Sequence, residues 1–477
     1  MNFIKKIEEV DNLEIGNKAL NLKKLTKQNI NVPRSWIISS EVLMNILKEK
    51  GFNIVNNGIY IDDILDVRIY LKKFFLKEYY FQLYNEIEHI KQNTKIKNFA
   101  IRSSGNIEDS LKNSLSGIFE SYLNISKIAN IIFSIQSCIL NSIREEVVDY
   151  MKNNNMLYIQ PCSIILQEFI YSYKSGVIFK DCEKKIINMN YGMNKYVVDG
   201  IGNIDELVLD LNDNIINKKQ GKKSAIFPVF SKTNPRVNEV INIEAISQYT
   251  KVITSNLEEN YIEVELQQNT KEVLTEEELE KLLSQCLKVS KILNCTNYDI
   301  EWTFDRDRLY ILQCRPLTVD KVCIDYEIKK NKALGLVSGE YIGKVKKVNN
   351  LEEAKNFKQG EILVAKSLNK NVLMALSKAG ACMISAKSPL SHSSILARER
   401  GIPTIGAINI EDIEDNKIYK INGKTGEYLK LDEFELSKIS KNDNNKFSNA
   451  ISEDVIDLFL KNFSSIKTDL FLLNDKK

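Results

Sequence analysis

The sequence has little of several features that define other classes of protein. It contains only two histidines among 477 residues. Its eight cysteines are scattered and form no Cys-x-x-Cys pair, which argues against a structural zinc site or a redox site. No run of about 18 apolar residues occurs, so no membrane-spanning helix is expected. The charged N-terminus has no apolar core of signal-peptide length, so we expect a cytoplasmic protein with reduced thiols.

The charge of the chain is nearly balanced. It has 66 basic and 63 acidic residues, for a formal net charge of +3. A dedicated nucleic-acid-binding protein usually has a clustered basic face, so we expect neither nucleic acid nor a membrane as a partner. No internal repeat is visible.

The length of the chain is sufficient for two to four domains. Residues 1–317 contain strand-rich stretches and amphipathic helices and form the first predicted domain, which is long enough for two subdomains. Residues 318–333 are charged and lack apolar periodicity, which predicts a linker. Short strands and helices alternate in a second domain at 334–431, and a polar linker with a C-terminal helix is expected at 432–477. The pattern is that of an α/β (α+β) protein.

Several individual elements follow from local patterns. Thr275 to Glu278 has the form of a capping box, which predicts a helix running to about Leu293. Other predicted elements are an amphipathic helix at Ile61–Tyr80, two apolar runs at Ile164–Ile170 and Ser175–Phe179, a hairpin at Asp299–Gln313, and buried strands at Gly360–Ala365 and Gly380–Ser385.

One of the two histidines, His392, lies among small hydroxyl residues. Ser391, Ser393 and Ser394 surround it where an apolar helix is expected to begin. Imidazole is a nucleophile near neutral pH, and the amides and hydroxyls at a helix N-terminus can receive phosphate oxygens. The pattern therefore suits a phosphoryl carrier. The alternative is a buried or capping histidine without chemistry.

The segment Ser391–Arg398, followed by Gly401–Pro403, resembles the phosphohistidine site of the phosphoenolpyruvate-utilising enzymes. This family includes pyruvate phosphate dikinase, phosphoenolpyruvate synthase and rifampin phosphotransferase. The resemblance implies that His392 is catalytic and lies on a small α/β domain that swivels between two sites. The family often has a glycine-rich approach to the histidine, whereas this chain has Lys387–Leu390 there.

Four blocks in the first domain resemble the ATP-binding domain of the same family, a variant of the ATP-grasp fold. They are Gly16–Leu22, Ala100–Asn124, Gln167–Phe179 and Asp299–Thr318. The resemblance implies that ATP binds near Lys18, Arg102 and Gln167. For Gln167 the alternative is a strand residue of the core.

The fourth block carries the predicted metal site. Adjacent strands of a hairpin can bring Glu301 and Gln313 together, and carboxylate and amide oxygens suit Mg²⁺. Arg315 lies two residues from Gln313 on the same face and can reach the transferring phosphate. The resemblance assigns all three residues to ATP and gives Arg315 a catalytic role. A purely structural hairpin is the alternative.

Two departures from the family pattern bear on function. Lys195 stands where many relatives have an acid, and the nearly 50 residues after Leu431 are too few for the acceptor barrel, which needs roughly 250. The resemblance implies an ATP- and Mg²⁺-dependent phosphotransferase that forms phosphohistidine from the β-phosphate and releases AMP and phosphate. Without room for the barrel, we expect the acceptor to be a small molecule. The alternatives are a phosphohistidine carrier or regulatory protein that acts on a partner polypeptide, and a plain kinase that makes ADP.

Overall fold

The computed structural model divides the chain into two compact units, Met1–Val322 and Cys323–Lys477. The residues that it describes are 2–11, 15–55, 57–105, 121–153, 156–194, 197–198, 204–221, 224–228, 249–256, 261–266, 272–317, 333–368, 372–386 and 391–431. The predicted linker at 318–333, apart from Ala333, and all of 432–477 lie outside them. The predicted domain boundaries therefore stay predictions.

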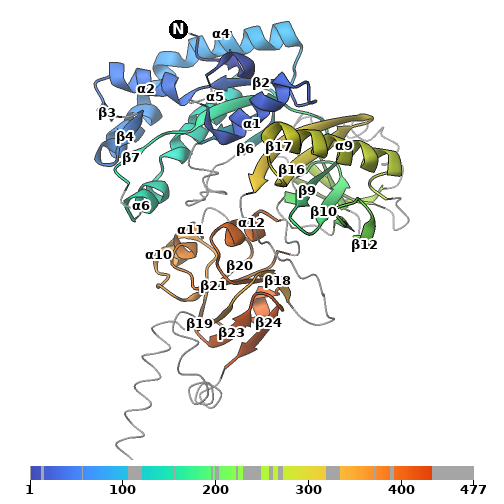
Figure 1. The fold of residues 1–477 in the computed structure, drawn as a ribbon. Coiled ribbons are helices and arrows are strands. Elements are labelled where there is room, and N and C mark those ends of the chain that lie inside the picture. Colours follow the sequence, from blue (N-terminus) through green and yellow to red (C-terminus); the bar gives the residue numbers. More distant parts are fainter. Residues whose placement is uncertain are drawn as a thin grey trace, which may run out of the picture. The chain divides into compact units, whose positions relative to one another are not determined.

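The first unit contains a five-stranded sheet with helices packed against it (Figure 1). Its strand order is β1(Lys5–Lys6), β2(Ser35–Ile38), β8(Ser163–Glu168), β5(Phe99–Ser104) and β6(Ser121–Ile125), and all neighbours are antiparallel. Buried Ile, Leu and Phe side chains dominate the central strands, as expected for a sheet covered on both faces.

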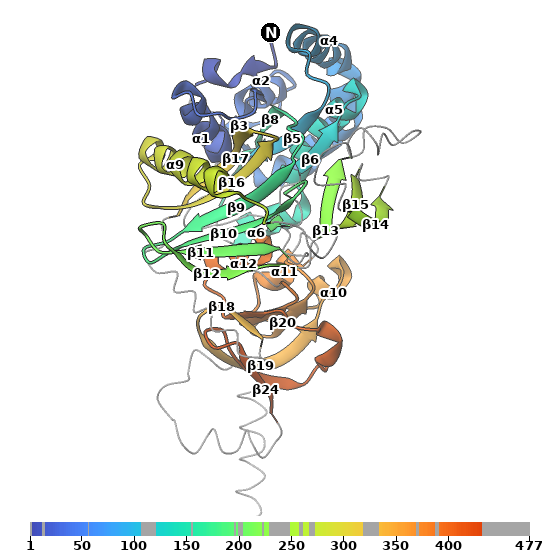
Figure 2. The ribbon, with the colours of Figure 1, turned by 90° about the vertical axis from the view of Figure 1, so that its right-hand side faces the viewer.

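A second, six-stranded antiparallel sheet lies in the same unit (Figure 2). Its order is β12(Ile215–Lys219), β11(Asp205–Leu209), β10(Lys185–Tyr191), β9(Lys174–Lys180), β16(Asn297–Asp305) and β17(Arg308–Leu317). The two predicted apolar runs are confirmed as β8 and β9, which belong to different sheets. The five residues between them carry the chain from one sheet to the other. Two three-stranded sheets complete the unit: β3(Ile54–Val55), β4(Gly58–Tyr60) and β7(Tyr158–Ile159), and β13(Ser224–Pro228), β15(Tyr261–Leu266) and β14(Tyr249–Asn256).

The helices of the first unit are amphipathic and cover these sheets. They are α1(Gly16–Lys27), α2(Ser40–Glu49), α3(Ile64–Tyr70), α4(Leu76–Thr94), α5(Ile128–Ser142), α6(Glu145–Asn153) and α9(Glu276–Leu293). The capping box predicted for α9 is present, with both the Thr275 and the Glu278 side chains bonded to backbone N–H groups. The helix predicted at Ile61–Tyr80 is longer than expected: α3 continues through a π-helical segment at Leu71–Phe75 into α4, which ends at Thr94.

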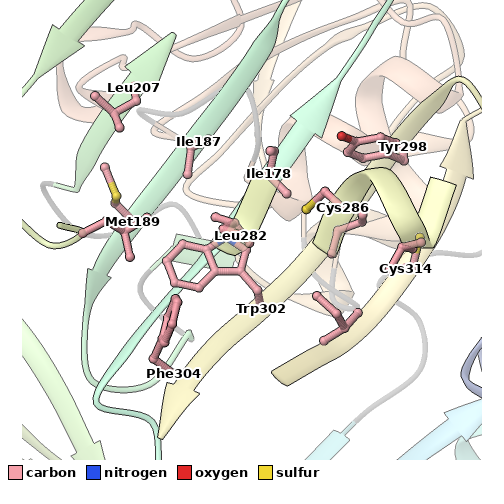
Figure 3. Close-up of a cluster of buried hydrophobic side chains, with 14 of the residues drawn as sticks. Ile178, Ile187, Met189, Leu207, Leu282, Cys286, Tyr298, Trp302, Phe304 and Cys314 are labelled. Carbon is pink, nitrogen blue, oxygen red and sulfur yellow. The ribbon is translucent and has the colours of Figure 1, made fainter. Parts of the chain in front are cut away.

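The main core of the first unit lies between α9 and one face of the six-stranded sheet (Figure 3). Trp302 and Phe304 on β16 contact each other edge-on, with ring centroids 5.8 Å apart. Cys286 on α9 and Cys314 on β17 are buried in this cluster, and burial raises the pKa of both thiols. Both thiols therefore remain protonated near neutral pH and serve as packing groups.

The second unit is a smaller α/β domain. Its seven-stranded sheet has the order β18(Leu334–Val337), β22(Thr404–Gly406), β21(Ala381–Ile384), β20(Ile362–Ala365), β19(Glu340–Lys347), β23(Ile418–Asn422) and β24(Glu427–Lys430). The four strands from β22 to β19 are parallel, and three helices connect them: α10(Leu351–Lys355), α11(Leu373–Leu376) and α12(His392–Glu399). The buried strands predicted at 360–365 and 380–385 are confirmed as β20 and β21. Across the described residues of both units, no helix is long and apolar enough to cross a membrane.

Candidate functional site

The hairpin of β16 and β17 brings Glu301 and Gln313 together as predicted. The two residues are direct cross-strand partners, and Arg315 lies opposite Asp299 two residues along the same face. The register shifts just after this pair, because Trp302 faces Ile311. Such a bulge re-aims neighbouring side chains and is common beside active sites. Gln313 is 8% exposed and Glu301 is half-buried, so both side chains are largely shielded from bulk solvent.

The hairpin pair belongs to a row that crosses most of the six-stranded sheet. Gln313, Glu301, Val177, Asn188 and Glu206 face one another in register on successive strands. Their alternation places them on the face opposite the Trp302 core. Glu206 and Glu301 are three strand spacings apart, about 14 Å. The row therefore places Glu206 and Glu301 on the same face of the sheet.

Asn188 and Glu206 are polar residues of this face that sequence reasoning missed. Burial raises the pKa of Glu206, and the positive charges of Lys219 and Lys184 act against that shift. A signal was present in the sequence, because Asn188 and Asn190 alternate with Ile187 and Met189. Alternation of this kind marks a strand with one apolar and one polar face.

The start of α1 is fixed against the end of β5. Gly16 has a φ of +71°, and a Cβ at this position would lie 2.4 Å from the carbonyl oxygen of Ser104. The Ser104 hydroxyl accepts the N–H of Ala19 at 3.0 Å and donates to the carbonyl oxygen of Ile15 at 2.7 Å. Helix α1, which carries Lys18, therefore begins where the strand that carries Arg102 ends.

The same helix is also tied to the hairpin. The side-chain amide of Asn21 donates to the carbonyl oxygen of Cys314 at 3.1 Å. Cys314 lies between Gln313 and Arg315, so this bond holds α1 against the strand that carries both. The spacing of Gly16, Lys18 and Asn21 therefore has a physical reason: the first and last residues anchor the helix to two sheets, with the lysine between them.

We expect Gly16→Ala to disrupt the contact between the start of α1 and the end of β5. The new Cβ would overlap the Ser104 backbone and require a left-handed alanine, at a combined cost of about 2–5 kcal/mol in unfolding free energy. Gly51→Ala is the matched control, because Gly51 has a φ of +86° and a Cβ added there would have nothing within 4 Å. The control should cost only about 1–2 kcal/mol. Urea unfolding and ATP titration measure both variants, and equal effects would contradict the packing argument.

Arg102 and Gln167 occupy the five-stranded sheet in different ways. Arg102 is half-buried, and among the described residues its buried Nε has no hydrogen-bond partner. A buried donor of this kind suits an anionic ligand such as phosphate. Gln167 is 1% exposed, and its amide lies 3.5 Å from the Ser35 hydroxyl. This position matches the alternative of a core residue, so a contact between Gln167 and the nucleotide stays a prediction.

In the second unit, α12 begins where the sequence predicts. Ser391 is the N-cap, and its hydroxyl accepts the N–H of Ser394 at 3.3 Å. His392 is therefore the first residue of the helix. The helix follows β21 at the carboxyl edge of the parallel strands, where α/β domains commonly bind ligands. The side chain of His392 and the residue Lys195 lie outside the described part of the structure.

The serine hydroxyls around His392 are buried and hydrogen-bonded within the protein. Ser391, Ser393 and Ser394 are at most 3% exposed. The Ser393 hydroxyl accepts the N–H of Leu368 at 2.8 Å, and the hydroxyls of Ser391 and Ser394 lie 2.8 Å apart. We expected these groups to receive phosphate oxygens, whereas the structure uses them to hold the first turn of the helix.

The fold and the site define an α/β protein with an ATP-grasp-type nucleotide-binding domain and a smaller second domain. The family model for the pyruvate phosphate dikinase AMP/ATP-binding domain matches residues 12–334, and the model for the mobile domain of phosphoenolpyruvate-utilising enzymes matches residues 357–426. The chain belongs to the pyruvate phosphate dikinase AMP/ATP-binding family. This assignment confirms the predicted family and fold class, and it implies ATP and Mg²⁺ as the cofactors, as in that family.

The relatives of the chain include phosphoenolpyruvate synthases. A probable phosphoenolpyruvate synthase of Pyrococcus abyssi is 26% identical over 352 residues, which cover 70% of this chain and 39% of that protein. The phosphoenolpyruvate synthase of Aquifex aeolicus is 28% identical over 363 residues, which cover 69% and 40%. A probable phosphoenolpyruvate synthase of Staphylothermus marinus is 24% identical over 464 residues, covering 84% and 54%. The chain thus spans about half the length of these relatives or less.

The residues present fit the implied cofactors. Glu301 and Gln313 offer a carboxylate and an amide oxygen at one point, the hard ligands that Mg²⁺ shares with phosphates. Bound there, Mg²⁺ would neutralise phosphate charge. Arg102 offers the buried Nε donor described above. The side chains in both places are of the kinds that bind phosphates.

Proposed function

We propose that this protein is an ATP-dependent phosphotransferase of the dikinase type that uses His392 as a phosphoryl carrier. An imidazole nitrogen of His392 forms a bond to the β-phosphorus, and the bond between that phosphorus and AMP breaks. Cleavage of the β–γ bond by water releases the γ-phosphate as orthophosphate. The phosphohistidine then gives its phosphoryl group to an acceptor, so the net products are AMP, orthophosphate and a phosphorylated acceptor.

The observation that carries this proposal is the cross-strand pair of Glu301 and Gln313, with Arg315 on the same face of β17. A carboxylate, an amide and a guanidinium at one point supply metal ligands and a donor for developing phosphate charge. The family matches add that a nucleotide-binding domain and a mobile domain occur in one chain. In this proposal Lys18 and Arg102 bind and orient the phosphates, and Gln167 contributes on the nucleotide side.

A phosphohistidine must visit two places, since one imidazole takes the group from ATP and delivers it elsewhere. We infer that the domain at 334–431 swivels on the linker at 318–333 as a hinged carrier. The charged composition of 318–333 supports this inference. Limited proteolysis should cut there before it cuts the domain at 1–317.

The acceptor in this proposal is a small molecule. The names of the relatives make pyruvate the first compound to test, followed by amino acids, amides, guanidines and sugar alcohols. An acceptor bound by a partner protein is the alternative outcome. The charge balance supports no role for nucleic acid, and the scattered cysteines without pairs support a cytoplasmic location.

The nucleotide product tests the proposal. With Mg-ATP and the correct acceptor, the protein should release AMP and orthophosphate in equal amounts, measured by anion-exchange chromatography. AMP formation with a metabolite pool alone indicates a small-molecule acceptor, while AMP formation only after addition of cell protein indicates a partner. Formation of ADP as the sole product would contradict the proposal and indicate a direct kinase.

A further inference from the structure

The loop after β20 and the first turn of α12 lie at the same edge of the second unit. Strands β20 and β21 are parallel neighbours, with Ala365 opposite Ile384 at their ends. The chain leaves β20 into residues 366–368 and leaves β21 toward Ser391 and α12. The hydrogen bond from the Leu368 N–H to the Ser393 hydroxyl, 2.8 Å long, joins these two segments.

Both partners of this hydrogen bond are buried. Ser393 is 3% exposed and Leu368 is fully buried. A buried backbone N–H must have an acceptor, because leaving it unpaired is costly. Among the described residues, the Ser393 hydroxyl is the acceptor for this group. Loss of the hydroxyl would therefore favour a shift of the loop, of the helix turn, or of both.

The serines on either side of His392 have different tasks. Ser391 acts within the helix, since its hydroxyl caps the N–H of Ser394. The Ser393 hydroxyl bonds outside the helix, because it accepts the N–H of Leu368 and so attaches the first turn to the loop after β20. A helix of eight residues is too short to hold its position through intrinsic stability, so external contacts must fix it. His392 is the first residue of this turn and moves with it.

We propose that Ser393 is a positioning residue for His392: its hydroxyl fastens the first turn of α12 to the loop after β20 and so fixes the nucleophile in place. This inference rests on the proposed role of His392 as the phosphoryl carrier. Phosphoryl transfer depends on placement, and an error of about 1 Å can cost up to a hundredfold in rate. The hydroxyl acts through the backbone and does not contact the phosphate.

Three variants separate loss of the hydrogen bond between Leu368 and Ser393 from a general loss of stability. Ser393→Ala removes the acceptor, and Ser393→Cys keeps a weak acceptor of similar size. Ser394→Ala is the matched control, because it removes a similarly buried hydroxyl from the same turn, one that bonds to Ser391 within the turn itself. Thermal unfolding of each full-length variant checks that it folds.

Two measurements on the full-length chain test the proposal. In the first, labelling of the protein by ATP radioactive in the β-phosphate should be about tenfold slower in Ser393→Ala, with Ser393→Cys between it and the wild type. The KM for ATP should be unchanged. Ser394→Ala should be slowed clearly less. Equal losses in the two alanine variants, or wild-type labelling of Ser393→Ala, would overturn the proposal.

The second measurement does not depend on catalysis. The chain has only two histidines, so a histidine-labelled sample gives one ring signal for His392 and one for His89 on α4 as an internal reference. Ser393→Ala should shift or broaden the His392 signal and leave the His89 signal in place. An unchanged His392 signal would overturn the inference. If the wild type takes up no label while Ser393→Ala shifts the signal, the proposed function fails and the positioning role stands.

Discussion

Replacing His392 with alanine is expected to abolish AMP formation. The imidazole is the proposed nucleophile, and no other group in the proposal can carry the phosphoryl group between two sites. The variant should still bind ATP, because Lys18, Arg102 and the Glu301 pair belong to the other unit. Rates of AMP release and ATP affinity by calorimetry measure the two effects separately.

The second histidine provides the control for this variant. His89 lies on α4, and its Nε2 is 2.8 Å from the side-chain amide of Asn93 in an exposed position. His89→Ala should therefore keep the wild-type rate. AMP release by His392→Ala at more than a trace of the wild-type rate would show that the carrier is another residue.

The Glu301→Gln variant is expected to lose more than about a hundredfold in Mg²⁺-dependent turnover. The substitution keeps the shape of the side chain but removes the charge that favours the metal. Gln313→Ala should have a smaller effect, since an amide oxygen is a neutral ligand. Raising the Mg²⁺ concentration should recover part of the activity in both variants, and a magnesium titration of turnover measures this.

Glu276→Gln is the control for the carboxylate, since Glu276 is an exposed residue in the first turn of α9. Its turnover should equal that of the wild type. Stability should also change little in Glu301→Gln, because a half-buried carboxylate on a ligand-binding face contributes little to folding. Full turnover in Glu301→Gln would remove the hairpin pair from the site.

The parts of the fold that the sequence predicts well are those with local causes. The capping box at Thr275 and the start of α12 at Ser391 depend on hydrogen bonds within four residues, and both are present. The pairing of Glu301 with Gln313 depends on a short hairpin, whose register the intervening turn largely sets. The helix after Ile61 extends beyond its predicted end, because buried apolar residues continue at helical spacing through Leu83, Ile87 and Ile90.

The parts that the sequence does not predict depend on long-range contacts. Nothing local to Asn21 indicates that its amide bonds to Cys314, nearly 300 residues away. The cross-strand alignment of Glu206 with Glu301 likewise needs the pairing of β16 with β9, which lie far apart in the chain, in addition to the registers of the consecutive strands β9, β10 and β11. Ser393 illustrates the same limit, because its role becomes visible only when the loop at Leu368 is placed against it.

Transfer of the β-phosphate to the protein is the most direct test of the central claim. The wild-type chain is mixed with Mg-ATP radioactive at either the β- or the γ-phosphate, and the protein is separated under alkaline conditions, in which phosphohistidine is stable. We predict acid-labile label on a peptide containing His392 from β-labelled ATP, while the γ-label appears as orthophosphate. Label retained from the γ-phosphate, or no label from the β-phosphate, would contradict the account.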